Sequence, residues 1–106
     1  MKTKEKIYKI KAITLKTIRT NPIVMEIFCD GEANTPGWEC PELIPLIYSV
    51  PPANGIYEFD FIAVPSEGVV PQVITEIKAK YIRLNFPDSL EGIKIYSSSN
   101  SLIQNR

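Results

Sequence analysis

The side chains that could do chemistry in this sequence are mainly carboxylates. Glu58 and Asp60 lie two residues apart in 56-IYEFDFIAV-64, which alternates apolar and acidic residues. On a strand, this spacing places both carboxylates on one face, roughly 7 Å apart. Such a pair could hold a divalent cation or serve as an acid and a base. The pattern is also typical of a solvated strand face whose aromatic side is core, and we favour this second interpretation because no third oxygen ligand accompanies the pair.

Several common chemistries are missing from the sequence. It contains no histidine, which removes the commonest general base, the serine triad and the commonest metal ligand. Two cysteines alone cannot make a four-ligand zinc site, and the isolated glycines form no phosphate-binding loop. We therefore predict a protein that is not an enzyme and has no cofactor. An enzyme or cation-binding domain built on Glu58 and Asp60 is the alternative.

The most distinctive segment is 31-GEANTPGWECPEL-43, which holds the only tryptophan. Tryptophan often dominates binding interfaces, and rigid scaffolds often present function on loops. The acidic neighbours would give this apolar anchor a rim that suits a basic protein or peptide. The candidate binding residues are therefore Trp38, Glu32, Glu39 and Glu42. The alternative is that Trp38 is a plug that closes one end of the fold, with its indole N–H bonded to a backbone carbonyl.

This loop should have a neighbour at the same end of the molecule. We expect residues 32–42 and the turn 51–55 to lie together, because both border strands of the same acidic central segment. Proline residues would hold this end stiff, so that little ordering entropy would oppose binding. They lie at positions 36, 41, 45, 51 and 52.

The two cysteines are predicted to be free thiols. Cys29 shares a strand face with Met25 and Ile27, so we interpret it as a small core residue and not as a nucleophile. Ten residues lie between Cys29 and Cys40, too short a separation to join strands of opposite sheets.

Charge is divided unevenly along the chain. Residues 1–20 hold seven basic side chains and one acidic one, whereas residues 26–67 hold eight acidic side chains and no lysine or arginine. A net charge of zero, with an acidic central segment, argues against a nucleic-acid partner. Counterion release from nucleic acid needs a clustered basic face. We expect the basic segment to lie beside the acidic strands, where the charges compensate across the sheet.

Length and hydropathy bound the class of protein. A chain of 106 residues predicts one domain, residues 1–106, with shallow sites only. No apolar run approaches the roughly 20 residues that span a bilayer, so no membrane association is expected. Lysine recurs as far as Lys16, which leaves no apolar run of the secretory-signal type. We expect a cytoplasmic protein, with a mature secreted form as the alternative.

The dominant hydrophobic period is two, with strand formers between proline, glycine and asparagine. It predicts an all-β fold, a single antiparallel β-sandwich of about seven strands with Greek-key, immunoglobulin-like order. A small barrel is the alternative. Residues 98–106 are expected to fray as a polar tail. The strands are expected near residues 6–19, 23–30, 43–50, 56–64, 69–77, 79–85 and 92–97.

The first of these strands contains a break in phase. Its apolar residues occupy even positions as far as Ala12 and odd positions from Ile13. Such a change indicates a bulge, or a strand that leaves one sheet for the other. A homodimer paired through a sheet edge is a further possibility, and the stretch near Pro45 would suit it better than the first strand, whose lysines protect an edge.

Overall fold

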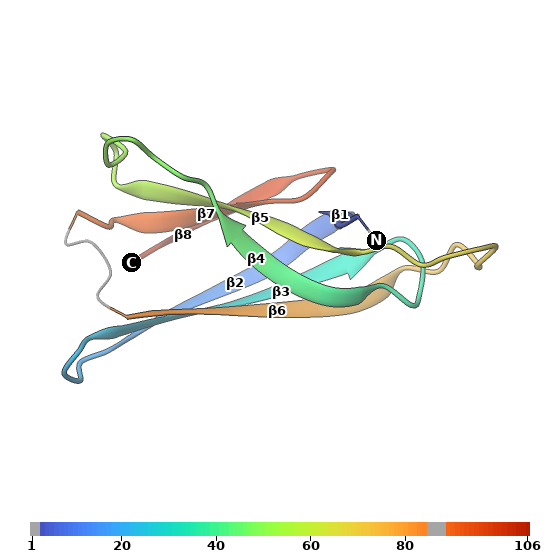
Figure 1. Cartoon of the computed structure of the whole chain (residues 1–106), viewed down its shortest axis with the longest axis horizontal. Helices are drawn as coiled ribbons and strands as arrows, with labels where there is room; N and C mark the ends of the chain where they lie inside the picture. The colour runs from blue at the N-terminus through green and yellow to red at the C-terminus, as the bar shows by residue number, and fades with distance from the viewer. Residues whose placement is uncertain (1–2, 85–88) are drawn as a thin grey trace.

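A computed structural model describes residues 3–84 and 89–106 of the chain. This part forms two packed sheets and contains no helix that could cross a membrane (Figure 1). The all-β, two-sheet architecture is therefore confirmed. The strands are β1 (Glu5–Lys6), β2 (Lys9–Ile18), β3 (Val24–Ala33), β4 (Glu39–Pro45), β5 (Ile56–Val64), β6 (Thr75–Leu84), β7 (Gly92–Tyr96) and β8 (Ser101–Asn105).

The two sheets differ in size. The smaller sheet has the order β2-β3-β6, with antiparallel pairs throughout. The larger sheet is built around β5, which pairs with β1, β4 and β7, while β8 pairs with β7. Because β1 and β4 both pair with Ile62, and β4 and β7 both pair with Phe59, β4 occupies one edge of β5 and the other two strands share its second edge.

One pairing differs from the predicted antiparallel arrangement, because β5 and β7 are parallel. The intervening strand β6 runs back in the opposite sheet. The chain therefore returns to the larger sheet in the direction in which it left, and β7 adds to β5 in parallel. The immunoglobulin-like strand order stays a prediction.

The prediction that residues 98–106 fray is wrong for most of that segment. Residues 97–100 form a turn, and β8 folds back to pair with β7 from Ser101 to Asn105. Leu102 packs against the core and holds this strand down. Its five-residue sequence, SLIQN, is too short and too polar to show a strand pattern by itself.

The phase break in the first strand is confirmed, and both of its suggested causes are present. β1 pairs with β5 in the larger sheet, and β2 pairs with β3 in the smaller one. A register shift also interrupts β2 between Ile10 and Ala12. Ile7, between the two strands, is fully buried where the chain crosses from sheet to sheet.

The core lies between the sheets and follows the predicted alternation. Phe59 and Phe61 are 3% and 0% exposed, as the sequence predicted. Gly31 is buried where an added Cβ would lie 2.3 Å from Ile7 Cδ1, so only glycine allows the chain crossing to approach β3 so closely. The other fully buried large side chains are Ile7, Ile10, Met25, Ile27, Ile93 and Ile95.

Hydrogen bonds between residues 7–10 and residues 97–100 join the two sheets, and we call this set of bonds the seam. Two backbone N–H groups of the turn donate to carbonyls of the N-terminal segment, at 2.8 and 3.1 Å. The Asn100 side chain uses both ends of its amide. Its Oδ1 accepts from Ile10 N–H at 2.7 Å, and its Nδ2–H donates to Ile10 C=O at 2.9 Å. Asn100 thus pairs with β2 as a strand residue would.

The two ends of the molecule are different. The sheets approach each other at the end that holds the N-terminus and the seam, and they spread apart towards the opposite end (Figure 1). We call the first the closed end, which also carries residues 34–38 and 65–74. The second is the open end, which carries residues 19–23 and 46–55.

The seam can be tested with Asn100→Asp. This change replaces the amide donor with a carboxylate oxygen facing Ile10 C=O, so we expect the free energy of unfolding to fall by about 2 kcal/mol. Asn105→Asp, at an exposed position on β8, adds the same charge and should change stability by less than about 0.5 kcal/mol. Urea unfolding of both variants is the measurement. Equal losses in the two would show that the seam contributes nothing specific.

Candidate functional site

Trp38 occupies a loop that folds against the protein. Its side chain is half-buried and packs against the core cluster, and its Nε1–H donates to Thr35 Oγ1 at 2.8 Å. Thr35 is 8% exposed. The partner of the indole is thus a side-chain hydroxyl and not the backbone carbonyl that the sequence suggested. The packing is that of a plug at the closed end.

A second loop fixes the Trp38 loop in place. Thr35 Oγ1 lies 3.2 Å from Ser66 Oγ, and the Ser66 hydroxyl donates to Pro36 C=O. Gly37 has a φ of 86°, a backbone conformation that residues with a Cβ rarely adopt. These contacts connect the loops on either side of β4 and β5, so Trp38 belongs to a rigid corner.

The acidic candidates do not form one rim around Trp38. Glu32 lies on β3 between buried Gly31 and Ala33, so it points away from the core on the outer face of the smaller sheet. Glu42 precedes buried Leu43 on β4, so it points outward from the larger sheet. The two carboxylates therefore face opposite sides of the molecule. Glu39 is exposed at the start of β4.

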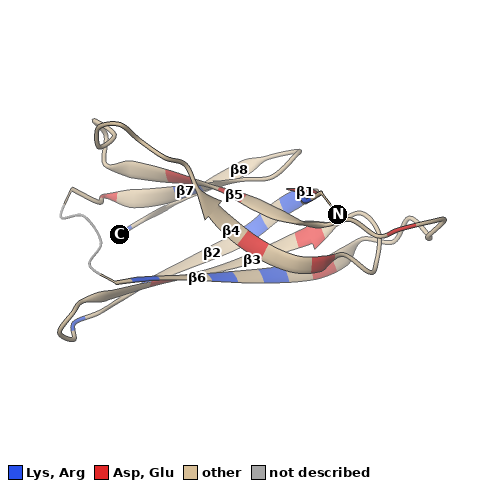
Figure 2. Cartoon of the chain, viewed as in Figure 1, with Lys and Arg blue, Asp and Glu red and all other residues tan. Residues whose placement is uncertain are grey.

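Lysines from the N-terminal segment pair with two of these acids and with Asp60. Lys4 Nζ lies 2.5 Å from Glu42, Lys11 Nζ lies 3.7 Å from Glu32, and Lys6 Nζ lies 3.7 Å from Asp60. Basic β1 and β2 therefore run beside the acidic strands (Figure 2), as the charge division predicted. Exposed pairs of this kind contribute at most about 1 kcal/mol each, but they reduce the acidic field that a basic partner would meet.

The expected grouping of residues 32–42 with the turn 51–55 is wrong. The loop before β4 lies at the closed end, whereas residues 51–55 lie at the open end (Figure 1). One strand separates the two segments, and a strand delivers the chain to the opposite end of its sheet. The loops before and after β4 therefore cannot meet.

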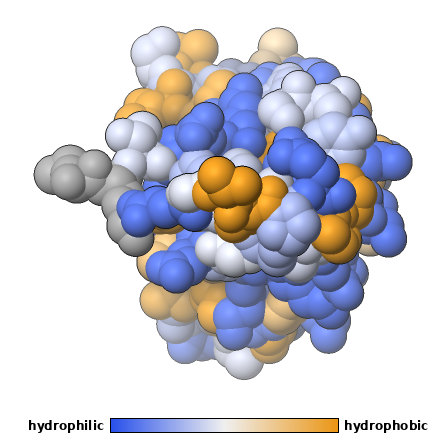
Figure 3. Space-filling view, turned by 90° about the vertical axis from the view of Figure 1, so that its right-hand side faces the viewer, coloured by the Kyte–Doolittle hydropathy of each residue, from blue (hydrophilic) through white to orange (hydrophobic). Residues whose placement is uncertain are grey.

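The surface of the closed end is mixed in character. Figure 3 looks onto this end and shows hydrophobic residues in small groups separated by hydrophilic ones. Val69, in the β5–β6 loop, is fully exposed. Single exposed apolar residues of this kind are normal on protein surfaces.

Glu58 and Asp60 share the outer face of the larger sheet, as predicted, but both are half-buried instead of exposed. Asp60 pairs with Lys6, and the neighbour of Glu58 on β7 is Lys94. Within residues 3–84 and 89–106, no group of three or more His, Cys, Asp or Glu side chains is placed to hold a metal ion. The geometry therefore gives the pair no support as a cation site.

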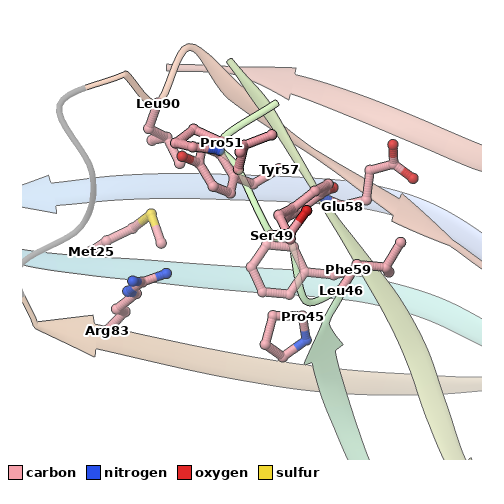
Figure 4. A pocket seen from close by; sticks show the side chains of 12 residues that line it. Met25, Pro45, Leu46, Ser49, Pro51, Tyr57, Glu58, Phe59, Arg83 and Leu90 are labelled. Carbon is pink, nitrogen blue, oxygen red and sulfur yellow. The ribbon is translucent and has the colours of Figure 1, made fainter. Parts of the chain in front are cut away.

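The best-formed concave site lies elsewhere, at the open end. β4 ends at Pro45 and not at the predicted residue 50, and the chain then leaves the sheet to form one wall of a hollow of about 240 Å³ (Figure 4). The hollow lies between the sheets, and most of its lining residues are apolar or aromatic, together with Ser49, Glu58 and Arg83. Its principal lining residues are Met25, Leu46, Tyr48, Tyr57, Phe59 and Leu90.

Two tyrosines form a fixed wall of this hollow. The rings of Tyr48 and Tyr57 meet edge to face, with centroids 5.7 Å apart and an angle of 82° between the planes. The Tyr48 hydroxyl accepts from Glu58 N–H at 3.1 Å, and the Tyr57 hydroxyl lies 3.1 Å from Ser89 Oγ. Burial raises the pKa of Tyr48 above its ordinary value, so its hydroxyl stays protonated at neutral pH. The wall is therefore pre-arranged and uncharged.

Arg83 brings a cation to the mouth of the hollow. On β6 it falls in phase with buried Ile77 and Ala79, so its side chain leaves the strand on the core side. It lies opposite buried Met25 in the register of β3 and β6. In Figure 4 the Arg83 side chain rises from β6 beside Met25, whereas the Glu58 carboxylate points away from the other side chains.

The alternation of residues along β6 could have placed Arg83 on the core side, but it was not among the candidate residues. Separate strands were predicted for residues 69–77 and 79–85, but β6 runs without a break from Thr75 to Leu84. A single continuous strand keeps its phase, which puts Arg83 on the same face as Ile77. No local pattern announces the hollow itself, because its walls come from segments far apart in the sequence.

The two cysteines occupy different environments, and both are free thiols, as predicted. Cys29 is 1% exposed in the core. Burial, with a smaller contribution from the negative charge of Asp30, raises its pKa from 9.0 to about 12. Cys40 is exposed and has a φ of 53° in the irregular first part of β4.

Comparisons of the chain with protein-family models, with curated proteins and with solved structures give no match. The site residues are therefore assigned from geometry and chemistry alone.

Trp38→Ala tests the role of the loop. The indole packs against the core and donates a hydrogen bond to Thr35 Oγ1. We therefore expect the free energy of unfolding to fall by about 3 kcal/mol. Trp38→Phe keeps most of the packing and loses the hydrogen bond, so its loss should be about 1 kcal/mol. A loss below about 0.5 kcal/mol in the alanine variant, measured by chemical unfolding, would contradict the plug and favour an exposed binding residue.

The thiols give a second test. The thiolate is the reactive form, so Cys29 should be inert at pH 8 while Cys40 reacts. We expect a thiol-specific reagent to modify one cysteine per native chain and two after unfolding, with peptide mass spectrometry assigning the first to Cys40. Rapid modification of Cys29 in the native protein would mean that β3 opens readily to solvent.

Proposed function

We propose that this protein is a non-catalytic binding module whose ligand site is the hollow at the open end. The observation that carries the proposal is the concave, mainly apolar lining that both sheets contribute there. Ligand sites in small proteins are commonly clefts of this kind, with few polar groups and many aromatic ones. A non-catalytic binding function is also what the sequence suggested. The proposed site, however, lies at the opposite end of the molecule from the Trp38 loop.

The size of the hollow supports a small ligand. A cavity of about 150 Å³ can hold one benzene molecule, and this hollow measures about 240 Å³. It has room for one aromatic ring and a short chain. A larger partner would have to bind mainly through the surrounding surface.

The walls also support binding without a large ordering cost. Tyr48 and Tyr57 hold each other in place, and Pro45 and Pro51 restrict the segment that carries Tyr48. Pre-arranged sites lose less conformational entropy on binding. The lining residue Val50 is 70% exposed, so part of its apolar surface remains accessible.

A basic peptide at the Trp38 loop has less support. Two of its three acidic candidates already pair with lysines, and they face opposite sides of the molecule. Trp38 itself is committed to packing and to Thr35. An interface needs an accessible anchor with an unpaired rim, so the open end is the better candidate.

The proposal can be tested with 3-phenylpropionate and its neutral amide, each followed by amide NMR shifts. About 11 non-hydrogen atoms at roughly 0.3 to 0.5 kcal/mol each give a Kd near the millimolar range. We expect at least one compound to produce saturable shifts at the residues that line the hollow.

Ser49→Phe provides the matched variant. Ser49 lines the hollow and is exposed, so the added ring should fill the site and abolish binding without loss of stability. Gln72→Phe adds the same ring to an exposed position at the closed end and should leave binding unchanged. Failure of both compounds to bind, or binding that survives Ser49→Phe, would overturn the proposal.

A further inference from the structure

We infer that the ligand of the hollow is a small carboxylic acid with an apolar or aromatic body, and that Arg83 binds its carboxylate at the mouth. The inference rests on the proposed function, because it names the ligand class of the same site. It depends on where Arg83 lies, on what surrounds it and on which polar groups the lining offers.

The position of Arg83 is unusual for a strand of this kind. The other core-side residues towards the middle of β6 are Ile77, Ala79 and Tyr81, and all are buried or half-buried. The cationic residues Lys78 and Lys80 leave the strand on its outer face. Arg83 is the basic side chain that β6 directs to the inner side, where it is exposed at the mouth of an apolar site.

Arg83 has no carboxylate partner within the part of the chain that the structure describes. Lys4, Lys6, Lys11 and Lys78 form ion pairs with carboxylates of the described residues, and Arg83 takes part in none of these pairs. Glu58 is the other charged residue of the lining, and its carboxylate points away (Figure 4). The guanidinium therefore has donors available to a ligand, arranged in a planar fork that matches a carboxylate.

The remaining polar groups of the lining also favour an anionic ligand. The Tyr48 oxygen already accepts a hydrogen bond from Glu58 N–H, so its own proton can be donated to a ligand. Arg83 offers donors only. Together the Arg83 and Tyr48 donors suit a ligand group that accepts hydrogen bonds.

The charge balance points to a carboxylate and not a phosphate. One guanidinium neutralises one negative charge, and the apolar walls would leave the second charge of a phosphate monoester without a partner. Uncompensated charge beside apolar surface is costly. The volume of about 240 Å³ further commits the site to a free small acid, because a peptide C-terminus would carry additional residues past the mouth.

The test compares 3-phenylpropionate with 3-phenylpropionamide, which have nearly the same shape but differ in charge. In the unmodified protein we expect the acid to bind about tenfold more tightly than the amide. Arg83→Gln should remove this difference, chiefly by weakening the binding of the acid. Lys80→Gln removes the same charge from the outer face of the same strand and should retain the preference.

Each contrary result has a definite meaning. Equal affinities in the unmodified protein, a preference that survives Arg83→Gln, or its loss in Lys80→Gln as well would each overturn the role of Arg83 while the binding site stands. Tighter binding of phenyl phosphate, or of a tripeptide ending in phenylalanine, would overturn the ligand class. If neither 3-phenylpropionate nor 3-phenylpropionamide binds, the proposed function itself is overturned. Unfolding free energies within about 0.5 kcal/mol of the unmodified protein confirm that the variants fold.

Discussion

The seam is the constraint on which the rest of the structure depends. It ties the chain crossing at residues 7–10 to the turn at residues 97–100, so the first and last parts of the sequence hold the two sheets together at one end. The side-chain amide of Asn100 bonds both backbone groups of Ile10, as a residue of a neighbouring strand would. Because this attachment lies at one end only, the sheets can separate towards the other. The hollow at the open end is thus a consequence of how the closed end is joined.

Electrostatics follow the same organisation. Lys4 before β1, Lys6 on β1 and Lys11 on β2 compensate carboxylates on β4, β5 and β3. Basic and acidic residues therefore lie side by side along the middle of the molecule (Figure 2). Arg83 lies outside this pattern, on the inner side of β6. A cation on the core side of a strand, at the mouth of an apolar hollow, is a more specific feature than the net charge of a loop, and this is why the open end and not the Trp38 loop is the stronger binding candidate.

Much of the fold could be predicted from the sequence because it depends on local alternation. The period of two indicated that the aromatic side of β5, with Phe59 and Phe61, is core, and the phase break before Ile13 indicated the register shift between Ile10 and Ala12. Non-local features could not be predicted in the same way. β8 shows no pattern until it has β7 as a partner, and the parallel pair depends on β6 crossing to the other sheet. The acidic candidates were grouped by sequence proximity, whereas strand alternation sends Glu32 and Glu42 to opposite outer faces.

The most direct test of the open-end site is to locate a bound ligand by intermolecular nuclear Overhauser effects. For 3-phenylpropionate, the site predicts contacts from the ring protons to the methyl groups of Met25, Leu46 and Leu90. No contact to Trp38 or Val69 is expected, because both lie at the closed end. Ring contacts to Trp38 without contacts to Met25 or Leu90 would contradict the account and place the binding site on the opposite end of the molecule.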